Sequence, residues 1–265
     1  MGTIAITGAA SGMGAATKAR LEAGGHRVIG VDQRDADVVA DLSTADGRRA
    51  AIAGVRDRAG GSLDGLVTYA GVGPLPNRAG SLLVSVNYFG TVELLTGLRE
   101  LLAAGTDPAA VAISSNSTTT QPGVPAALVT ACLSGDEAEA RRVGDEVGSI
   151  GAYPATKTAV ARWVRRNATT PEWIGAGITL NAIAPGFIAT PMTEEGKNDP
   201  ELGPLLDQFP LPVGRPGRAE EIAALVAFLL GPDGRFFCGS VLFDDGGTDA
   251  LLRPDDFPQN WEPPA

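Results

Sequence analysis

Residues 7–14 read Thr7-Gly8-Ala9-Ala10-Ser11-Gly12-Met13-Gly14 and follow a short apolar, strand-like run at Ile4–Thr7. A helical stretch, Gly12–Ala23, begins inside them. Glycines at such a junction permit a tight turn and let backbone amides approach a pyrophosphate at the helix N-terminus. The spacing, Gly-x-x-x-Gly-x-Gly, differs from the Gly-x-Gly-x-x-Gly of other dinucleotide folds, and a glycine turn alone is a weak signal. The segment makes Gly8, Ser11, Gly12, Met13 and Gly14 candidate cofactor-binding residues.

The rest of the chain continues the alternation of strand-like and helical runs that this turn begins. Strict alternation predicts an α/β fold, with a parallel sheet covered by helices on both faces. Right-handed crossovers then give the doubly wound, Rossmann-type architecture, and we expect one domain over residues 1–265. Strands are predicted near Val28–Val31, Leu66–Thr68, Ala110–Ser114, Ile178–Ala182 and Val241–Phe243, and helices at Ala45–Arg58, Leu82–Leu102, Tyr153–Asn167 and Ala219–Leu230.

Two segments are longer than this scaffold requires. Residues 116–152 form an insert before a predicted helix, with a solvated loop at Thr118–Thr120 and a charged helix at Asp136–Val147. Residues 190–216 are rich in proline and glycine with interspersed apolar side chains. Long connections in compact domains are usually functional or disordered. We expect little regular structure in the acidic, proline-rich tail, residues 253–265.

Composition restricts the location and the partners. The 21 basic and 31 acidic residues give a net charge of −10, which disfavours a nucleic-acid partner. The longest apolar run, Ile222–Leu230, is shorter than the ~20 residues that span a bilayer. The two cysteines have no metal-binding spacing, and we expect a cytoplasmic protein without a metal or membrane partner.

Tyr153 and Lys157, four residues apart, are the first candidate catalytic pair. Positions i and i+4 share a helix face, so the phenol and the ammonium can reach one cleft. A free phenol has a pKa near ~10 and exchanges protons poorly at neutral pH. A nearby cation favours the phenolate and lowers that pKa, so the pair is a candidate general acid and base.

Asp32 ends the second predicted strand, about 20 residues beyond the glycine turn, where a carboxylate can accept hydrogen bonds from the adenosine ribose. The same carboxylate would repel a 2′-phosphate. Although Arg34 lies close by in the sequence and could receive that phosphate, NAD is favoured over NADP.

The chain resembles the short-chain dehydrogenase/reductase family over nearly its whole length. Further motifs look like the branch of bacterial 3α-hydroxysteroid dehydrogenase/carbonyl reductases. The family resemblance rests on the glycine turn, Asp32, Asp41-Leu42, Asn87, Ile113-Ser114-Ser115, Tyr153-x-x-x-Lys157 and Asn181-Ala182-Ile183-Ala184-Pro185-Gly186. The branch resemblance rests on Asp35-Ala36-Asp37, Asp41–Gly47, Val84–Gly90 and the long insert.

This resemblance implies a role for each matched residue. Tyr153 would exchange a proton with the substrate oxygen, while Lys157 would lower its pKa and bind the nicotinamide ribose. Ser115 would hydrogen-bond the substrate carbonyl, and Asn87 would hold a water that connects Lys157 to solvent. The remaining cofactor contacts would come from Asp41, Leu42, Ala70, Gly71, Pro185, Gly186, Ile188 and Thr190. Thr68-Tyr69 replaces the two asparagines of the family's Asn-Asn-Ala-Gly segment, so the side-chain contribution there differs.

The insert has two interpretations. It covers one face of the catalytic helix and blocks a common tetramer-forming surface, or it shapes a wall of the substrate cleft. The resemblance implies the first, and thus a homodimer rather than a tetramer. We place the substrate pocket between the insert and residues 190–216, with Met192 and Phe209 as candidate contacts.

Three functions are compatible with these residues. The first is an NAD-dependent oxidoreductase that interconverts a secondary alcohol and a ketone on a small hydrophobic, steroid-like substrate. The second keeps the chemistry but acts on an aromatic or terpenoid alcohol. The third, a non-catalytic NAD-binding regulator, would be expected to lose the tyrosine, lysine or serine, and all three are present.

Overall fold

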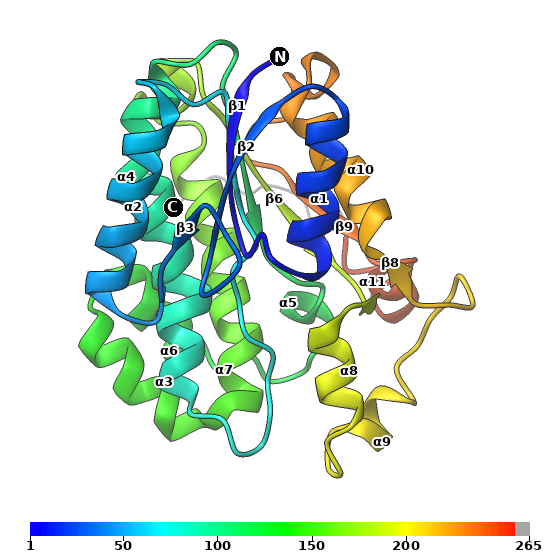
Figure 1. The fold of residues 1–265 in the computed structure, drawn as a ribbon. Coiled ribbons are helices and arrows are strands. Elements are labelled where there is room, and N and C mark those ends of the chain that lie inside the picture. Colours follow the sequence, from blue (N-terminus) through cyan, green and yellow to red (C-terminus); the bar gives the residue numbers. More distant parts are fainter. Residues whose placement is uncertain (258–265) are drawn as a thin grey trace, which may run out of the picture.

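A computed structural model describes residues 1–257. Its centre is a seven-stranded parallel sheet with the strand order β3-β2-β1-β4-β5-β6-β9 (Figure 1). The order reverses between β1 and β4, and this reversal creates a crevice at the carboxyl ends of the strands. The strands are β1 (Thr3–Thr7), β2 (Arg27–Asp32), β3 (Val38–Val39), β4 (Gly65–Thr68), β5 (Ala109–Ile113), β6 (Thr179–Pro185) and β9 (Val241–Asp244); β7 (Ile188–Ala189) and β8 (Gly217–Arg218) form a separate pair.

Helices cover both faces of the sheet. In Figure 1, α1 and α10 lie on one side, and α2, α4 and α7 lie on the other. The helices are α1 (Gly12–Ala23), α2 (Ala45–Ala59), α3 (Gly80–Leu83), α4 (Gly90–Ala103), α5 (Ser117–Thr120), α6 (Ala126–Ser134), α7 (Glu137–Asn167), α8 (Pro191–Lys197), α9 (Gly203–Leu206), α10 (Ala219–Leu230) and α11 (Thr248–Leu252). A π-helix, η1 (Val84–Phe89), joins α3 to α4, and η2 (Ile174–Ala176) and η3 (Pro232–Gly234) are 3₁₀ turns.

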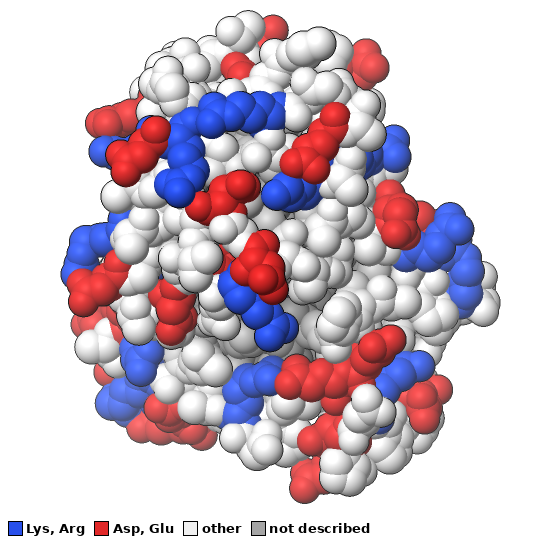
Figure 2. Space-filling view, viewed as in Figure 1, with Lys and Arg blue, Asp and Glu red and all other residues white. Residues whose placement is uncertain are grey.

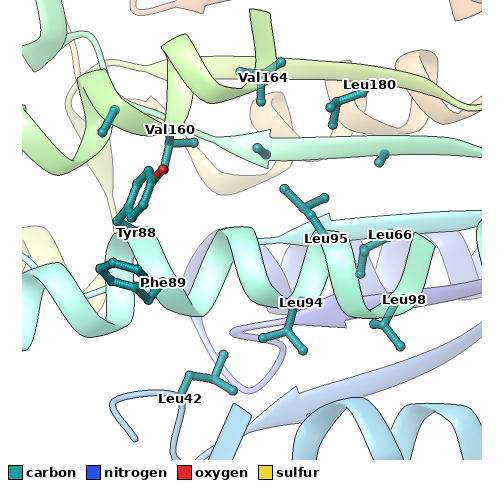
Figure 3. Packing of buried hydrophobic residues seen from close by; sticks show 14 of the residues in the cluster. Leu42, Leu66, Tyr88, Phe89, Leu94, Leu95, Leu98, Val160, Val164 and Leu180 are labelled. Atoms are coloured by element: carbon teal, nitrogen blue, oxygen red, sulfur yellow. The ribbon is translucent and has the colours of Figure 1, made fainter. Parts of the chain in front are cut away.

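The core explains why the central strands are apolar without alternation. Every residue of β4, β5 and β6 is buried, as expected for parallel strands that helices cover on both faces. Figure 3 shows Leu95 of α4 and Val164 of α7 approaching Leu66 and Leu180 of the sheet. This packing fixes α4 and α7 relative to the carboxyl ends of the strands.

The structure confirms the predicted α/β class and contains each of the predicted strands and helices. It also contains elements that were not predicted, among them the short strands β3, β7 and β8. The predicted helix Leu82–Leu102 is divided by η1, since a π-helical segment inserts there. The segment Gly80–Ala103 is long and apolar enough to cross a membrane, contrary to the sequence estimate, but 72% of the relevant window is buried inside the protein. It therefore serves as a core helix.

The insert contains more helix than expected. Thr118–Thr120 belongs to α5 rather than to a solvated loop, because the Thr118 hydroxyl caps the Ser115 carbonyl and the Thr119 hydroxyl binds Asp249 of α11. The charged helix is confirmed as the first half of α7. Gly148, at φ +69° and ψ 170°, separates it from the half that carries Tyr153. The tail prediction is tested only to residue 257, where the chain after α11 has no helix or strand.

Charges are dispersed over the surface seen in Figure 2, where acidic and basic side chains alternate. Several of them pair along or between helices, such as Arg142 with Glu139 and Arg215 with Glu221. The acidic side chains therefore form no single acidic face in this view.

Candidate active site

The glycine turn closes against the neighbouring strand connection. Gly8 has φ +69°, and a Cβ there would lie 2.8 Å from the Ala70 nitrogen. A Cβ at Gly14 would lie 2.0 Å from the Gly8 carbonyl oxygen. Side chains at either position would push α1 away from the turn. The Ser11 hydroxyl makes no capping bond to α1, which leaves the first amides of this helix for an anionic ligand.

A cleft of about 200 Å³ runs from this turn across the sheet edge. Asp32 lines its far end and holds the turn, since its Oδ2 accepts a hydrogen bond from the Ala10 amide at 3.0 Å. Leu42 and Gly71 line the cleft as predicted. Sequence reasoning did not identify Val31, Gln33, Ala40, Val72 and Val86, which also line it. They lie within two residues of Asp32, Leu42, Gly71 or Asn87, and this closeness in the sequence could have identified them as cleft residues.

Asp41 lies outside the lining of this cleft, and its implied adenine contact stays a prediction. Its side chain is exposed and its Oδ1 accepts a hydrogen bond from the Ser43 amide at 2.9 Å. That bond lowers the pKa of Asp41. The carboxylate thus stabilises the turn before α2, and only its neighbour Leu42 faces the cleft.

Tyr69, which stands where the family has the second asparagine of its Asn-Asn-Ala-Gly segment, has a structural role. Its buried hydroxyl lies 2.7 Å from the Thr17 hydroxyl of α1, and burial raises the pKa of this phenol. The next residue, Ala70, donates its amide to the Thr7 hydroxyl at 3.0 Å. The tyrosine therefore ties α1 to the end of β4 directly behind the glycine turn.

Ser115, Tyr153 and Lys157 line a second cavity of about 80 Å³. This cavity shares Met13, Tyr69, Gly71, Val72, Thr190 and Met192 with the first, so the two form one continuous cleft. The remaining predicted residues here, Pro185, Gly186 and Ile188, also line the second cavity. The structure thus brings together the residues that the spacing only suggested.

Two hydrogen bonds fix the catalytic half of α7 to the end of β5. The Lys157 ammonium donates to the Ile113 carbonyl at 3.0 Å, and the Ser114 hydroxyl donates to the Lys157 carbonyl at 2.9 Å. Lys157 Nζ lies 5.9 Å from the centroid of the Tyr153 ring. Both side chains therefore face the same cavity, as the i, i+4 spacing predicted.

Burial dominates the electrostatics of this pair. It lowers the pKa of Lys157 to about 8, because no carboxylate compensates the desolvated ammonium. It also raises the pKa of Tyr153, with the Ser115 hydroxyl acting in the opposite direction. The implied effect of Lys157 on the pKa of this phenol therefore stays a prediction, since desolvation is the largest influence on Tyr153 in the protein alone.

Asn87 uses its side chain to hold a peptide group. Its Oδ1 accepts from the Val72 amide at 2.8 Å, and its Nδ2 donates to the Val72 carbonyl at 3.0 Å. A Cβ at Gly71 would lie 3.1 Å from Asn87 Oδ1 and 3.6 Å from Lys157 Nζ. Asn87 therefore stands beside Lys157, with its amide committed to the cleft wall.

Helix α8 covers the cleft from the other side. Thr190 caps this helix with a capping box to Thr193, and Met192 packs over Gly73, whose Cβ would lie 2.9 Å from Met192 Cγ. Arg78, in the connection after β4, forms a 2.9 Å ion pair with Glu195 of α8. These contacts hold the connection after β4 against α8 across the cleft.

Phe209 lies away from the cleft, so its predicted substrate contact is not supported. Its ring stacks on Phe187 at 5.8 Å between centroids. Leu205 and Val213 of the same segment are largely exposed. Of the predicted apolar contacts, Met192 faces the cavity.

Comparisons with known proteins identify the family. A family model described as enoyl-(acyl carrier protein) reductase matches residues 136–249. The chain is 42% identical to a 3-alpha-hydroxysteroid dehydrogenase/carbonyl reductase of Comamonas testosteroni over 97% of this chain and 100% of that protein. It is 31% identical to a coniferyl-alcohol dehydrogenase from a Pseudomonas strain, over 92% of this chain and 95% of that one.

A solved structure gives the same result. The 3-alpha-hydroxysteroid dehydrogenase of a Pseudomonas species, complexed with NADH, superposes with a TM-score of 0.91 at 48% identity. It covers 96% of this chain and 100% of that one. The chain belongs to the short-chain dehydrogenase/reductase family, as its motifs predicted.

Proposed function

We propose that this protein is an NAD-dependent oxidoreductase that interconverts a secondary alcohol and a ketone on a small hydrophobic substrate, with steroids as the first choice. One observation carries the proposal: Ser115, Tyr153 and Lys157 line a cavity that continues into the cleft of the glycine turn and Asp32. The full-length similarity to a hydroxysteroid dehydrogenase supports the steroid-like substrate.

The cleft suits NAD in shape and charge. Gly8 and Gly14 leave no room for a side chain where a pyrophosphate would approach the backbone, and the amides of α1 face that position. The Asp32 carboxylate at the far end of the cleft would accept hydrogen bonds from the adenosine ribose hydroxyls and would repel a 2′-phosphate. The similar structure complexed with NADH supports the same cofactor.

Proton management falls to the side chains of the second cavity. NAD supplies the site that accepts or donates the hydride. In alcohol oxidation, Tyr153 accepts the hydroxyl proton and Ser115 donates a hydrogen bond to the same oxygen. Lys157 supplies positive charge that favours the phenolate, against the effect of burial. Asn87 holds the Val72 peptide beside Lys157 and so keeps the cavity wall in place.

A second substrate class has its own support. The coniferyl-alcohol dehydrogenase, at 31% identity over most of both chains, favours an aromatic alcohol. The rim beside Met192 is apolar in either case, and one methylene changes discrimination by only about 1–3 kcal/mol. Composition of the rim therefore does not select between the two.

An absorbance screen for NADH formation tests the proposal. The panel contains 3α- and 3β-hydroxysteroids, cinnamyl-type alcohols and small secondary alcohols. We expect the highest kcat/KM with a 3α-hydroxysteroid and a much lower one with NADP than with NAD. Preference for the aromatic alcohols would establish the second class. NADH binding without turnover of any panel member would instead support a non-catalytic regulator.

For assembly we propose a homodimer in the cytoplasm. Helix α6 of the insert packs against α7, the helix that carries Tyr153, which supports the blocking interpretation of the insert. The opposite edge strand, β9, is only partly buried. Exposed apolar side chains on β9 and on the segments that precede and follow it in the sequence are Phe228, Phe236, Phe243, Leu251 and Leu252. A second copy that covers this edge would remove an unpaired strand and an apolar surface from water.

A further inference from the structure

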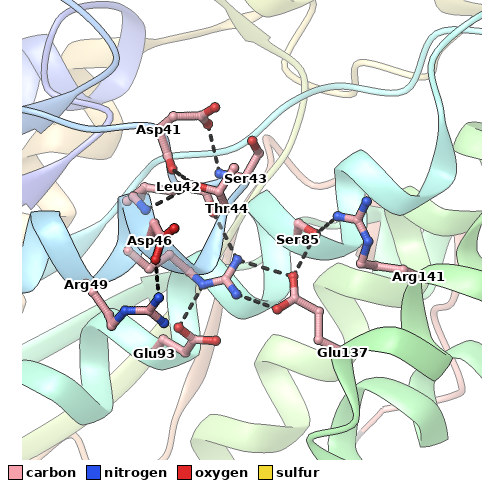
Figure 4. Close-up of polar contacts among 12 residues, drawn as sticks. Asp41, Leu42, Ser43, Thr44, Asp46, Arg49, Ser85, Glu93, Glu137 and Arg141 are labelled. Atoms are coloured by element: carbon pink, nitrogen blue, oxygen red, sulfur yellow. Dashed lines mark hydrogen bonds and ion pairs between the residues drawn. The ribbon is translucent and has the colours of Figure 1, made fainter.

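Arg48 of α2 has the largest of the fully buried side chains in the described part of the chain. A buried guanidinium is tolerated when its N–H groups are paired and hydrogen-bonded. Arg48 Nε donates to Glu93 at 2.7 Å, and its Nη1 donates to the Leu42 carbonyl at 3.2 Å. Figure 4 shows the partners Leu42, Glu93 and Glu137 gathered in one network of polar contacts. The same guanidinium pairs with both oxygens of Glu137.

These partners belong to three distant segments. Leu42 lines the cleft at the Asp32 end, Glu93 lies on α4, and Glu137 opens the charged helix of the insert. Arg48 therefore joins a wall of the cleft to the insert, although 89 positions separate it from Glu137. The insert thus has a contact with the adenosine end of the site as well as with the catalytic helix.

A second branch of the same hydrogen-bond network reaches the π-helix η1. The Ser85 hydroxyl, in η1, donates to Glu137 Oε1 at 2.8 Å, and Arg141 of the insert binds the same hydroxyl. Val86, the next residue of η1, lines the cleft. A single carboxylate, Glu137, therefore binds both Arg48, which holds the Leu42 carbonyl, and Ser85, which precedes Val86. Leu42 and Val86 both line the cleft.

We propose that Arg48 and Glu137 are positioning residues for the cofactor, through which the insert holds Leu42 and Val86 in the arrangement that binds NAD. The proposal rests on the proposed NAD-dependent function. If Glu137 loses its charge, the buried Arg48 guanidinium keeps Glu93 as its ionic partner but is no longer held from the insert, so the position of its Nη1 against the Leu42 carbonyl is less well fixed. A smaller fraction of the molecules then has the binding-competent arrangement, and the apparent affinity for NAD falls in proportion to that fraction.

The alternative is a purely structural ion pair that only stabilises the fold. Breaking a purely structural pair would lower the melting temperature with and without cofactor, but it would not change the affinity of the folded molecules for NADH. Coupling is reciprocal, so a positioning role requires that cofactor binding also stabilise the insert. The two roles therefore differ in measurable properties other than stability.

Glu137→Gln removes the charge while keeping the side chain's shape, and Glu146→Gln is the matched control on the same helix. Glu146 pairs with Arg142 on the exposed side of that helix. For Glu137→Gln we expect the dissociation constants of NADH and ADP-ribose, from fluorescence and calorimetric titration, to rise together by about tenfold. The value of kcat at saturating NAD should stay unchanged, and Glu146→Gln should bind like the unmodified protein.

Hydrogen exchange supplies an independent readout on the unmodified full chain. Adding NADH should slow amide exchange in residues 137–147, and this protection should be lost in Glu137→Gln. A folded Glu137→Gln with unchanged NADH affinity, or an insert whose exchange ignores NADH, would overturn the positioning role alone. If the unmodified protein itself does not bind NADH, the proposed function fails and this inference fails with it.

Discussion

Lys157 shows how a single residue can trade stability for function. Its ammonium is buried with one carbonyl partner, and burial lowers its pKa from 10.5 to about 8. The unfolded chain therefore binds one more proton than the folded chain between pH ~8 and ~10.5. The free energy of unfolding contributed by this group rises with pH across that window and carries its full penalty below pH ~8.

From this we predict that Lys157→Met stabilises the cofactor-free protein at pH 7 while abolishing turnover. The penalty that is removed amounts to about 3 kcal/mol at 1.36 kcal/mol per pKa unit, less about 1 kcal/mol for the lost hydrogen bond to Ile113. Urea unfolding at pH 7 and pH 10 should show a gain of about 2 kcal/mol that shrinks at the higher pH. Lys18→Met, at a partly exposed lysine, should show no such gain. A destabilised Lys157→Met would contradict the assigned burial cost.

Tyr153 should be replaceable without loss of cofactor affinity. We predict that Tyr153→Phe lowers kcat by about 10²–10⁴, the range of a lost general acid and base. NADH binding should persist, because the glycine turn and Asp32 are untouched. Tyr88→Phe is the matched control, since Tyr88 is buried in the core and lies outside the lining of the cleft. Steady-state rates and fluorescence titration provide the check, and a Tyr153→Phe variant with near-normal kcat would refute the role.

At the scale of elements, the connection after β4 and helix α8 meet across the mouth of the cleft. The Arg78–Glu195 ion pair joins them, and Arg78 is the more buried partner, with 17% of its side chain exposed against 49% for Glu195. Pairs of this exposure contribute only about 0–1 kcal/mol and weaken with salt. Such an energy is enough to change how often the mouth is closed over a bound cofactor.

Arg78→Gln is therefore predicted to raise the KM for NAD by a few-fold and to remove its dependence on salt between 50 mM and 500 mM KCl. The melting temperature should hardly change, because a pair this exposed contributes little to the free energy of unfolding. Arg215→Gln breaks another partly exposed pair, with Glu221, outside the linings of both cavities. It should leave the KM unaltered. An unchanged KM in Arg78→Gln would show that the ion pair does not hold the cleft closed.

The elements also show what a sequence can and cannot predict. Helix and strand periodicity predicted α1 and α10 to the residue, and the i, i+4 rule placed Tyr153 and Lys157 on one face. Local pattern carries no information on desolvation, so the raised pKa of Tyr153 was missed. Nor does it specify which of several apolar side chains in a long segment lines the cleft: Met192 does, whereas Phe209 stacks on Phe187.

At the scale of the whole molecule, the insert links the catalytic helix, the cofactor cleft and the subunit surface. Its α6 packs on the start of α7, and its charged helix holds Arg48 through Glu137. Contacts between segments 89 positions apart follow from tertiary packing and cannot be read from spacing. The length of residues 116–152 indicated that the insert has a function, but only the fold shows that it reaches two sides of the site.

Assembly provides the last prediction. If a second copy covers β9, light scattering should give twice the 27.0 kDa of one chain. Phe236 is fully exposed in the segment that precedes β9, so Phe236→Asp should place a charge in the interface and shift the protein toward monomer. Leu205→Asp is the matched control, because Leu205 is also exposed but lies on α9, away from the edge. A tetramer would contradict the blocking role of the insert, and a dimer that Phe236→Asp leaves intact would place the interface elsewhere.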